Sequence, residues 1–231
     1  MKTQKKVINF TSITEYKALE SFFEKMANKG WMLIKANRYS FEFYKTEPTK
    51  LKFSIHLFHY ESENCYPNNK TDQELADICE AAGWNLCASN HIYQIYCAYE
   101  TDNAIAMHTD SREEYRMVRN MFFKTQFIYI IFISLLTFIN VSAIVKYRSL
   151  KLPSVLHLSV YLANDLFIFI CITLVINAIV WFTLNKINLT SNKPLQFLSL
   201  KGVVIKHISL ISIYIAIKIL NYAINYKYLV S

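Results

Sequence analysis

Residues 166–184 read LFIFICITLVINAIVWFTL, and residues 127–145 read FIYIIFISLLTFINVSAIV. Neither stretch holds a formal charge, and about nineteen helical residues cover most of the roughly 30 Å of hydrocarbon in a bilayer. Because lipid offers the backbone no hydrogen-bonding partner, an apolar run of this length predicts a helix. With a third apolar segment, the sequence predicts an all-α transmembrane region of three helices at 126–231, with spans at about 126–146, 160–184 and 203–224.

The positive charge of the chain lies beside these apolar segments. The 231 residues carry a net charge of +8, and 53% of them are hydrophobic. Lys and Arg flank the predicted spans at Arg112, Arg116, Arg119, Lys124, Lys146, Arg148, Lys151, Lys186, Lys193, Lys201 and Lys206. This distribution is typical of membrane flanks that meet anionic lipid, so we expect the lipid bilayer as a partner and no direct binding of nucleic acid.

The orientation follows from the same flanks. Residues 1–10 do not read as the start of a signal peptide, so we expect the N-terminus to stay in the cytoplasm. With that orientation, eight Lys and Arg flank the spans on the cytoplasmic side, against four outside (Lys146, Arg148, Lys151 and Lys227). The sequence therefore predicts a multi-pass protein of the cell membrane with a cytoplasmic N-terminus.

The cysteines fit a reducing compartment. Cys65, Cys79, Cys87, Cys97 and Cys171 form no C-x-x-C motif and no paired framework. Disulfides are rare in the cytoplasm, and free cysteine packs well as a small core residue. We therefore expect free thiols that fill space.

The soluble half contains an internal repeat built around Gly30-Trp31 and Gly83-Trp84. Phe22-x-x-x-Met26-x-x-x-Gly30-Trp31-x-Leu33 matches Leu75-x-x-x-Cys79-x-x-x-Gly83-Trp84-x-Leu86. Each copy begins with a capping box, Ser12 with Glu15 or Thr71 with Glu74, and continues with apolar residues at helical spacing. Each glycine is expected in the left-handed conformation that ends a helix, and two strands follow it.

Strand-like segments before each helix, at 5–10 and 52–60, complete two β-α-β-β units. The predicted fold class is therefore α+β for a cytoplasmic domain at 1–105. It is a duplicated β-α-β-β domain with an antiparallel-rich sheet and two helices on one face. A connector helix is expected at 106–125, because Ser111 and Glu114 form a further capping box before an apolar stripe.

The strands are unusually aromatic, and five of their side chains form a candidate ligand face. These are Tyr39, Phe41, Phe43, Tyr93 and Tyr96. An aromatic cleft can hold a flat apolar ligand. The alternative is that these rings fill the core or cover a face packed on a partner, as aromatic strand residues commonly do.

The segment Phe23 to Leu33, FEKMANKGWML, followed by Tyr39-Ser40-Phe41-Glu42-Phe43, resembles the start of a bacterial family catalogued only as domain of unknown function 2812. Met107-His108-Thr109-Asp110, ahead of a helix at 111–119, is similar to the later signature of that family. The resemblance covers the first 120 residues or so. It implies a domain that is often followed by membrane helices and often encoded beside PadR-like regulators. It implies no activity.

The third predicted span carries a polar stripe. His207, Tyr214, Lys218, Asn221 and Asn225 fall on one face of the helix. Asp165 lies at a similar expected depth in the second span, so we predict that Asp165 and Lys218 form an intramembrane polar pair. The functional interpretation is an ion or proton path. The alternatives are a structural seam between helices and an interfacial helix whose lysines snorkel.

The sequence lacks the patterns of the common catalytic and metal sites. It contains no G-x-S-x-G, P-loop, G-x-G-x-x-G or H-E-x-x-H motif. His56 and His59 lie three apart on a predicted strand and so point to opposite faces, and His108 has no evident nucleophile partner. We expect no catalytic, cofactor-binding or metal-binding residues, and no enzyme.

Together these features predict a membrane-anchored sensory or regulatory protein. Its cytoplasmic domain would bind an apolar ligand or a regulatory protein such as a transcriptional regulator. One alternative is a non-catalytic interaction subunit of a membrane complex, whose helices assemble with those of a membrane protein. Another is a membrane-embedded enzyme that uses Asp165, His207 or Lys218.

Overall fold

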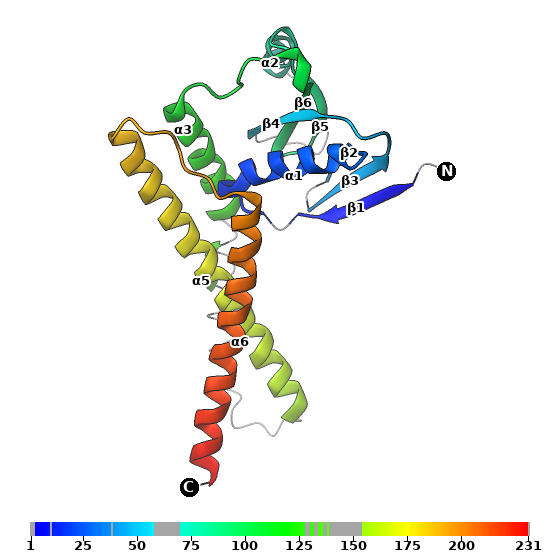
Figure 1. Ribbon diagram of the computed structural model, residues 1–231. Coiled ribbons are helices and arrows are strands. Elements are labelled where there is room, and N and C mark those ends of the chain that lie inside the picture. Colours follow the sequence, from blue (N-terminus) through cyan, green and yellow to red (C-terminus); the bar gives the residue numbers. More distant parts are fainter. Residues whose placement is uncertain are drawn as a thin grey trace. The chain divides into compact units, whose positions relative to one another are not determined.

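The chain divides into two compact units in the computed structural model (Figure 1). The structure describes residues 3–9, 11–37, 39–57, 70–127, 130, 131, 134, 135, 138 and 154–230. Some of these residues are described by their backbone alone, namely 70–73, 75, 154–165, 167, 171 and 220–230. The first unit is Met1–Phe122 with Ile187–Val203, and the second is Phe123–Lys186 with Val204–Ser231. The first unit thus includes the stretch at 187–203, which the sequence assigned to the membrane region.

The first three strands form an antiparallel sheet in the order β1-β3-β2. β1 (Gln4–Ile8) pairs with β3 (Ser40–Lys45), which pairs in turn with β2 (Trp31–Ala36). Helix α1 (Tyr16–Asn28) follows a 3-10 turn at Ile13–Glu15. The expected capping box holds this start, because the backbone N–H of Ser12 donates to Glu15 Oε2 at 3.0 Å.

The next three strands form a second antiparallel sheet in the corresponding order, β4-β6-β5. Along the chain, β4 (Leu51–Leu57) is followed by α2 (Lys70–Ala81), β5 (Asn85–Ser89) and β6 (Tyr93–Tyr99). Each sheet has one register irregularity, between Leu33 and Lys35 in β2 and between Leu86 and Ala88 in β5. The domain is therefore α+β, with two three-stranded sheets where the sequence predicted one.

The two helices do not share one face of a sheet, contrary to the prediction. The Phe23 ring of α1 packs against Phe41 of β3 at 4.9 Å between centroids and against Phe53 of β4 at 5.6 Å. The buried Cys79 of α2 packs instead with Tyr96 of β6. Tyr96 lies opposite the residue that follows Phe53, so Phe53 and Tyr96 project from opposite faces of the second sheet. The helices therefore cover opposite faces of that sheet, and α1 contacts both sheets.

The two glycines of the repeat have the conformation expected of them. Gly30 and Gly83 have φ angles of +75° and +88°, in the region that favours glycine. A Cβ atom at Gly30 would lie 2.5 Å from the carbonyl oxygen of Thr46, so no other residue fits there without movement of the backbone.

The two tryptophans of the repeat differ in their surroundings. Trp84 is buried and donates its indole N–H to the carbonyl oxygen of Ile105 at 2.6 Å. Trp31 is half-buried, and the ammonium groups of Lys5 and Lys45 lie 5.6 and 5.1 Å from its ring centroid.

Two cysteines are joined, which corrects the expectation of free thiols. Cys87 in β5 and Cys97 in β6 form a disulfide, whereas Cys79 is free and buried. Cys97 lies opposite Asn85, and the irregularity after Leu86 inserts Cys87 as an extra residue beside this pair. The bulge thus brings the two side chains together, which spacing alone did not reveal. Cys65 and the side chain of Cys171 lie outside the described residues.

Helix α3 (Ser111–Phe122) lies within the stretch 106–125 predicted as a connector helix, and a π-helical turn at Phe123–Phe127 follows it. Asp110 caps this helix, because the backbone N–H of Arg112 donates to Asp110 Oδ1 at 2.7 Å. The predicted capping partner Glu114 points elsewhere and bonds to Tyr16 of α1.

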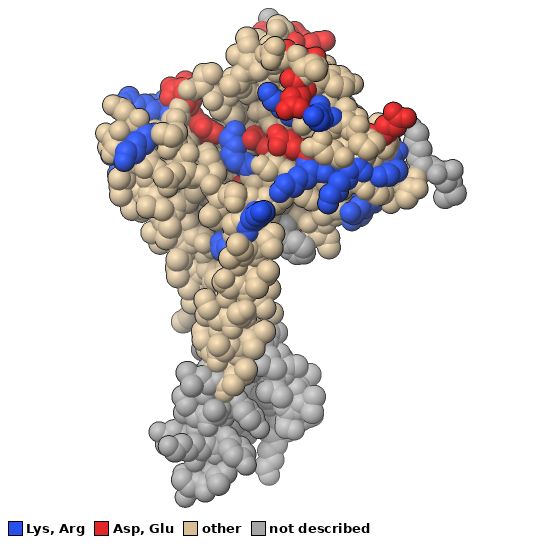
Figure 2. All heavy atoms as spheres, in the orientation of Figure 1, with Lys and Arg blue, Asp and Glu red and all other residues tan. Residues whose placement is uncertain are grey.

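Two helices are long and apolar enough to cross a membrane: Ile168–Thr190 within α5 (Ser154–Thr190) and Leu200–Ile219 within α6 (Leu200–Val230). Their apolar side chains are exposed, as in Ile179 at 59% and Ile205 at 63%. Figure 2 shows few charged side chains on the described part of these helices. Lipid accommodates such a surface, whereas water does not. The first predicted span, 126–146, lies outside the described residues except at a few positions.

The disulfide generates a testable prediction. Replacement of both Cys87 and Cys97 by Ser should lower the free energy of unfolding by about 2–3 kcal/mol in oxidising buffer, because the crosslink closes a loop in the unfolded chain. Thermal denaturation of the detergent-solubilised chain measures this effect. Dithiothreitol should bring the wild type to the stability of the double variant. It should lower the stability of a Cys79→Ala control by the same amount, because that variant keeps the disulfide. Insensitivity of the wild type to dithiothreitol would contradict the bond.

Candidate functional site

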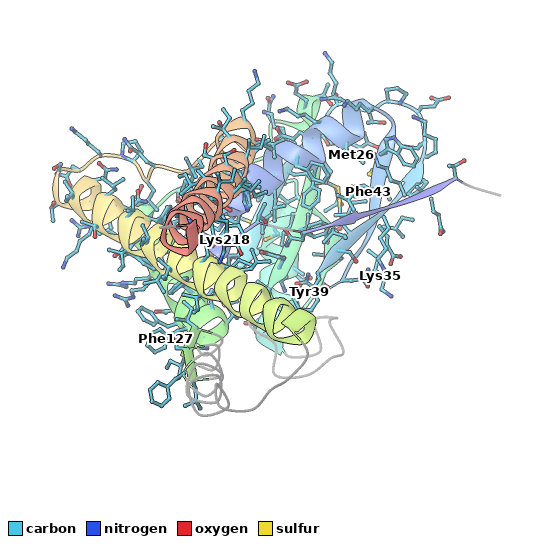
Figure 3. All side chains as sticks on the ribbon, turned by 90° about the horizontal axis from the view of Figure 1, so that it is seen from below. Met26, Lys35, Tyr39, Phe43, Phe127 and Lys218 are labelled. Carbon is cyan, nitrogen blue, oxygen red and sulfur yellow. A yellow bond between two sulfur atoms is a disulfide. The ribbon has the colours of Figure 1, made fainter. Side chains whose placement is uncertain are left out.

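The structure buries four of the five aromatic side chains of the predicted ligand face. Phe41 and Phe43 are 1% and 0% exposed, and they pack against the Phe22 and Phe23 rings of α1. Tyr39 is 64% exposed. In Figure 3, Phe43 lies beside α1 and Tyr39 lies on the side of the strands away from that helix.

Tyr93 and Tyr96 are buried on opposite faces of β6. Tyr96 packs with Cys79 and Trp84. Tyr93 bonds to the side chain of Asn9, and burial raises the pKa of Tyr93 to about 12. The structure therefore does not bring the five aromatic residues together on one open surface.

The predicted intramembrane pair is described only in part. The ammonium group of Lys218 lies 5.7 Å from the ring centroid of Tyr214, whose ring packs against Phe169 of α5 at 5.1 Å. The side chain of Asp165 lies outside the described residues, so its pairing with Lys218 stays a prediction.

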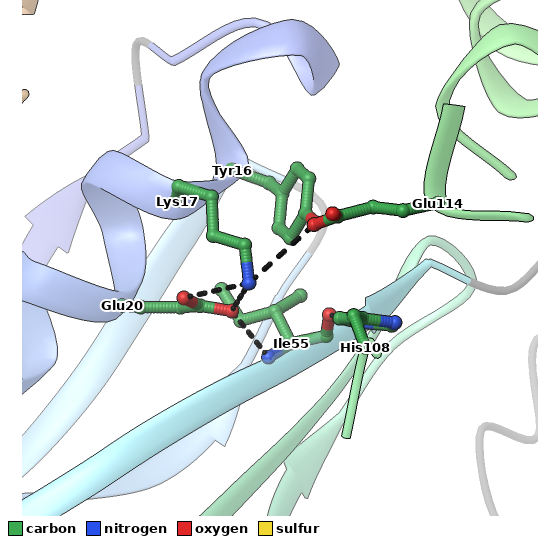
Figure 4. A network of polar contacts seen from close by, with 6 residues as sticks. All are labelled: Tyr16, Lys17, Glu20, Ile55, His108 and Glu114. Atoms are coloured by element: carbon green, nitrogen blue, oxygen red, sulfur yellow. Dashed lines mark hydrogen bonds and ion pairs between the residues drawn. The ribbon is translucent and has the colours of Figure 1, made fainter. Parts of the chain in front are cut away.

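Buried charge concentrates instead where α1, β4 and α3 meet (Figure 4). The hydroxyl of Tyr16 donates to Glu114 Oε1, and both side chains are buried. Lys17 Nζ lies 3.5 Å from Glu114 Oε1 and 3.3 Å from Glu20 Oε2. One ammonium group therefore lies between two carboxylates. Burial and the charge of Glu114 raise the pKa of Tyr16, which keeps its hydroxyl protonated as a donor.

Glu20 closes the open edge of the second sheet. β4 is an edge strand, and its Ile55 N–H donates to Glu20 Oε1 at 2.9 Å. The Glu20 side chain thus accepts a hydrogen bond from a backbone N–H that has no neighbouring strand to pair with. Burial raises the pKa of Glu20 to about 7, against the opposing effects of Lys17 and the Ile55 N–H. This carboxyl group therefore changes its protonation near neutral pH.

His108 completes the same edge. Its Nε2 lies 3.0 Å from the carbonyl oxygen of Ile55, and its ring stacks on His56 at 5.9 Å between centroids. Burial lowers the pKa of His56 to about 4 and also lowers the pKa of His108. Both imidazoles are therefore neutral at pH 7, and a neutral His108 donates to Ile55 through Nε2–H.

A ring from the α5–α6 loop reaches the same cluster. Phe197 packs edge-on against Tyr16 at 5.3 Å between centroids. Tyr16 thus contacts α3 through its hydroxyl and the loop through its ring.

A family model described as "Protein of unknown function (DUF2812)" matches residues 15–133. The chain belongs to this family. No curated protein and no solved structure matches the chain. The DUF2812 match includes Tyr16, Lys17, Glu20, Ile55, His56, His108 and Glu114, so the whole polar cluster lies within the family region.

The cluster suits structural coupling and proton binding better than covalent chemistry. Among the residues that the structure describes, no group of three or more His, Cys, Asp or Glu is placed to hold a metal ion. The ionisable side chains of the cluster are buried or half-buried, and they bond to one another or to the backbone or, for His56, stack on His108. The arrangement holds α1, β4 and α3 of this DUF2812 chain together. Protonation of Glu20 changes the net charge of the cluster.

Sequence reasoning missed this site. The sequence showed no evident nucleophile partner for His108, and His56 was compared only with His59, which lies outside the described residues. The stacking of His56 on His108 joins residues 52 positions apart, which no local pattern reveals. One signal was present: Glu20 follows Tyr16 by one helical turn and thus lies on the buried stripe of α1.

The shifted pKa values predict opposite effects of pH for two variants. The raised pKa of Glu20 contributes stability that is present below pH 4.5 and lost as the pH rises to about 7. The lowered pKa of His56 contributes stability that is present above pH 6.5 and lost as the pH falls to about 4. From pH 4.5 to pH 7, the free energy of unfolding of Glu20→Gln should therefore rise by roughly 2 kcal/mol more than that of the wild type. Over the same pH range, the free energy of unfolding of His56→Gln should rise less than that of the wild type.

Chemical denaturation of the full chain in detergent at several pH values measures these slopes. Lys25→Gln, at an exposed position of α1, is the matched control and should keep the wild-type slope. Equal pH profiles for Glu20→Gln and wild type would contradict the assignment.

Proposed function

We propose that this chain is a membrane-anchored regulatory protein whose α+β domain binds a regulatory protein and transmits the bound state to the membrane helices. The two contacts of Tyr16 carry the proposal. Its hydroxyl bonds to Glu114 in α3, the helix that precedes the membrane region, and its ring packs against Phe197 in the α5–α6 loop. One α1 residue thus touches both segments through which the domain continues into the apolar helices.

A regulatory protein fits the domain better than an apolar ligand does. Four of the five aromatic residues predicted to hold a ligand are buried. By contrast, Ile78 of α2 and Ile105 are 66% and 67% exposed. Both residues are bonded to Ala82 at the end of α2, because the Ala82 N–H donates to the Ile78 carbonyl and the Ala82 carbonyl accepts from the Ile105 N–H. Exposed apolar side chains in one region of a surface are typical of protein-binding surfaces.

A multi-pass topology with a cytoplasmic N-terminus is part of the proposal. The contact between Tyr16 and Phe197 supports an α5–α6 loop on the same side of the membrane as the domain. If α5 and α6 both cross, the chain between α3 and α5 must cross once as well, which gives three spans. The excess of flanking Lys and Arg on the domain side supports the cytoplasmic assignment.

Duplication of a β-α-β-β unit is also part of the proposal. The two sheets have corresponding strand orders, and their irregularities fall after Leu33 and Leu86, which are 53 positions apart. Gly30 and Gly83 have the same spacing and the same left-handed conformation.

Protease treatment of native membrane vesicles tests the proposal. In inverted vesicles, protease should remove the α+β domain, so that purification through a C-terminal tag no longer recovers the regulatory protein. In right-side-out vesicles, an antibody against the domain should detect it intact. A partner that is still recovered after loss of the domain would favour an interaction subunit whose helices bind the partner. Digestion of the domain in right-side-out vesicles would overturn the orientation.

A second experiment tests the role of Tyr16. Tyr16→Phe removes the hydrogen bond to Glu114 but keeps the ring, so hydrogen exchange in α3 should rise about tenfold, as expected for loss of a bond to a buried charge. Mass spectrometry of the full chain in nanodiscs measures this exchange. Tyr99→Phe, at an exposed tyrosine, is the matched control and should leave α3 unchanged. Exchange that rises only around residue 16 would contradict coupling.

A further inference from the structure

Charge is distributed very unevenly along the α+β domain. Residues 1–57 hold eleven Lys and Arg against five Glu, whereas residues 58–110 hold one Lys against nine Asp and Glu. The first part therefore has a net charge of +6 and the second part −8. Figure 2 shows basic side chains gathered along the β1 side of the domain and acidic ones at the α2 end. Such a distribution orients a domain in the electric field of a charged surface.

The first sheet presents basic and apolar side chains on its open face. Lys6 and Lys35 lie on either side of Glu42, since both pair with it across β3. They point away from α1, because Phe41 and Phe43 on the adjacent positions of β3 pack against that helix. Figure 3 shows Lys35 and Tyr39 on the side of the strands away from α1.

Three exposed apolar side chains accompany these lysines. Ile8, Ile34 and Tyr39 are 58%, 45% and 64% exposed. Ile8 follows Lys6 on the same face of β1, and the irregularity in β2 turns Ile34 outward beside Lys35. Tyr39 lies next to the end of β1, since the Asn9 N–H donates to its carbonyl oxygen at 2.9 Å. We call Lys6, Ile8, Ile34, Lys35 and Tyr39 the basic sheet face.

We propose that the basic sheet face docks on anionic lipid headgroups of the membrane in which the chain is anchored. Lysine is attracted to phosphate headgroups, while isoleucine and tyrosine enter the boundary between headgroups and acyl chains. The chain itself holds the domain at the bilayer, so headgroups are present at high effective concentration. This inference rests on the membrane anchoring proposed above.

The acidic half of a second copy is the competing occupant. Its charge would complement Lys6 and Lys35, and its exposed Ile78 and Ile105 offer apolar contacts. Lipid is favoured because the anchored chain holds the basic sheet face at headgroups of high effective concentration, whereas a second copy must be met by diffusion.

Lysine footprinting of the full chain in nanodiscs tests the docking. The nanodiscs contain phosphatidylcholine alone or with about 30 mol% phosphatidylglycerol, a content that gives the surface a negative potential. Acetylation by a neutral reagent is followed by mass spectrometry. Anionic nanodiscs should slow acetylation of Lys6 and Lys35 roughly fivefold, and about 0.5 M salt should abolish this protection through screening. Lys25 and Lys52, which are exposed and lie near Glu24 on the α1 side, are internal controls and should react alike in both lipids.

Matched variants separate docking from a general effect of the lipid charge. Lys6→Gln should reduce the protection of Lys35, whereas Lys25→Gln should preserve it. Equal rates in both lipids, or equal slowing of all four lysines, would overturn the docking. Protection that depends on protein concentration and not on lipid would assign the basic sheet face to contact with a second copy. That result would also overturn the docking on lipid. Failure of the chain to enter either nanodisc would refute the anchoring itself, a result distinct from insertion with unchanged rates.

Discussion

The α+β domain depends on the burial of two carboxylates, Glu20 and Glu114, beside one ammonium group. Removing a carboxylate from water costs several kcal/mol unless charges and hydrogen-bond donors compensate it. Lys17 lies within 3.5 Å of both carboxylates, and the Tyr16 hydroxyl and the Ile55 N–H donate to them. These donors belong to α1 and β4, while Glu114 belongs to α3. Both carboxylates are therefore satisfied only when the three elements are assembled together, which makes their packing cooperative.

The same cluster explains how an edge strand remains protected. β4 ends its sheet, and an exposed edge of this kind can pair with another chain. Glu20 binds the N–H of Ile55 and His108 binds its carbonyl oxygen, so both backbone groups at this position are occupied by side chains. His108 lies three residues before α3 and fixes the segment that enters the helix. Protection of the sheet edge and placement of the connector are thus one feature of the fold, and a change at Glu20 reaches both.

Local features of the fold could be predicted from the sequence, and long-range ones could not. The left-handed Gly30 and Gly83 and the Ser12–Glu15 cap depend on a few consecutive residues, and the structure confirms them. The assignment of both helices to one sheet face was wrong, because β4 and β6 bury residues on both faces and their pattern does not show which helix covers which. The Cys87–Cys97 bond required a bulge that residue types do not reveal. The cluster around Tyr16 joins residues nearly a hundred positions apart, so only the packed fold brings it together.

The disulfide is typical of an oxidising compartment, whereas the flanking charges favour a cytoplasmic domain. The packing around the disulfide shows how far the fold depends on this bond. Thiols are kept reduced in the cytoplasm, which is where the orientation proposed above places the domain. The crosslink joins β5 and β6, which are already paired from Asn85–Cys97 to Ser89–Gln94. Beside it, Ile95 is 0% exposed and lies opposite Ile55, so the hydrophobic core holds β6 independently of the bond. The hairpin therefore keeps its place in either redox state. A domain with this core can fold in a reducing compartment, which is compatible with the cytoplasmic orientation that we propose from the lysines and arginines beside the apolar helices.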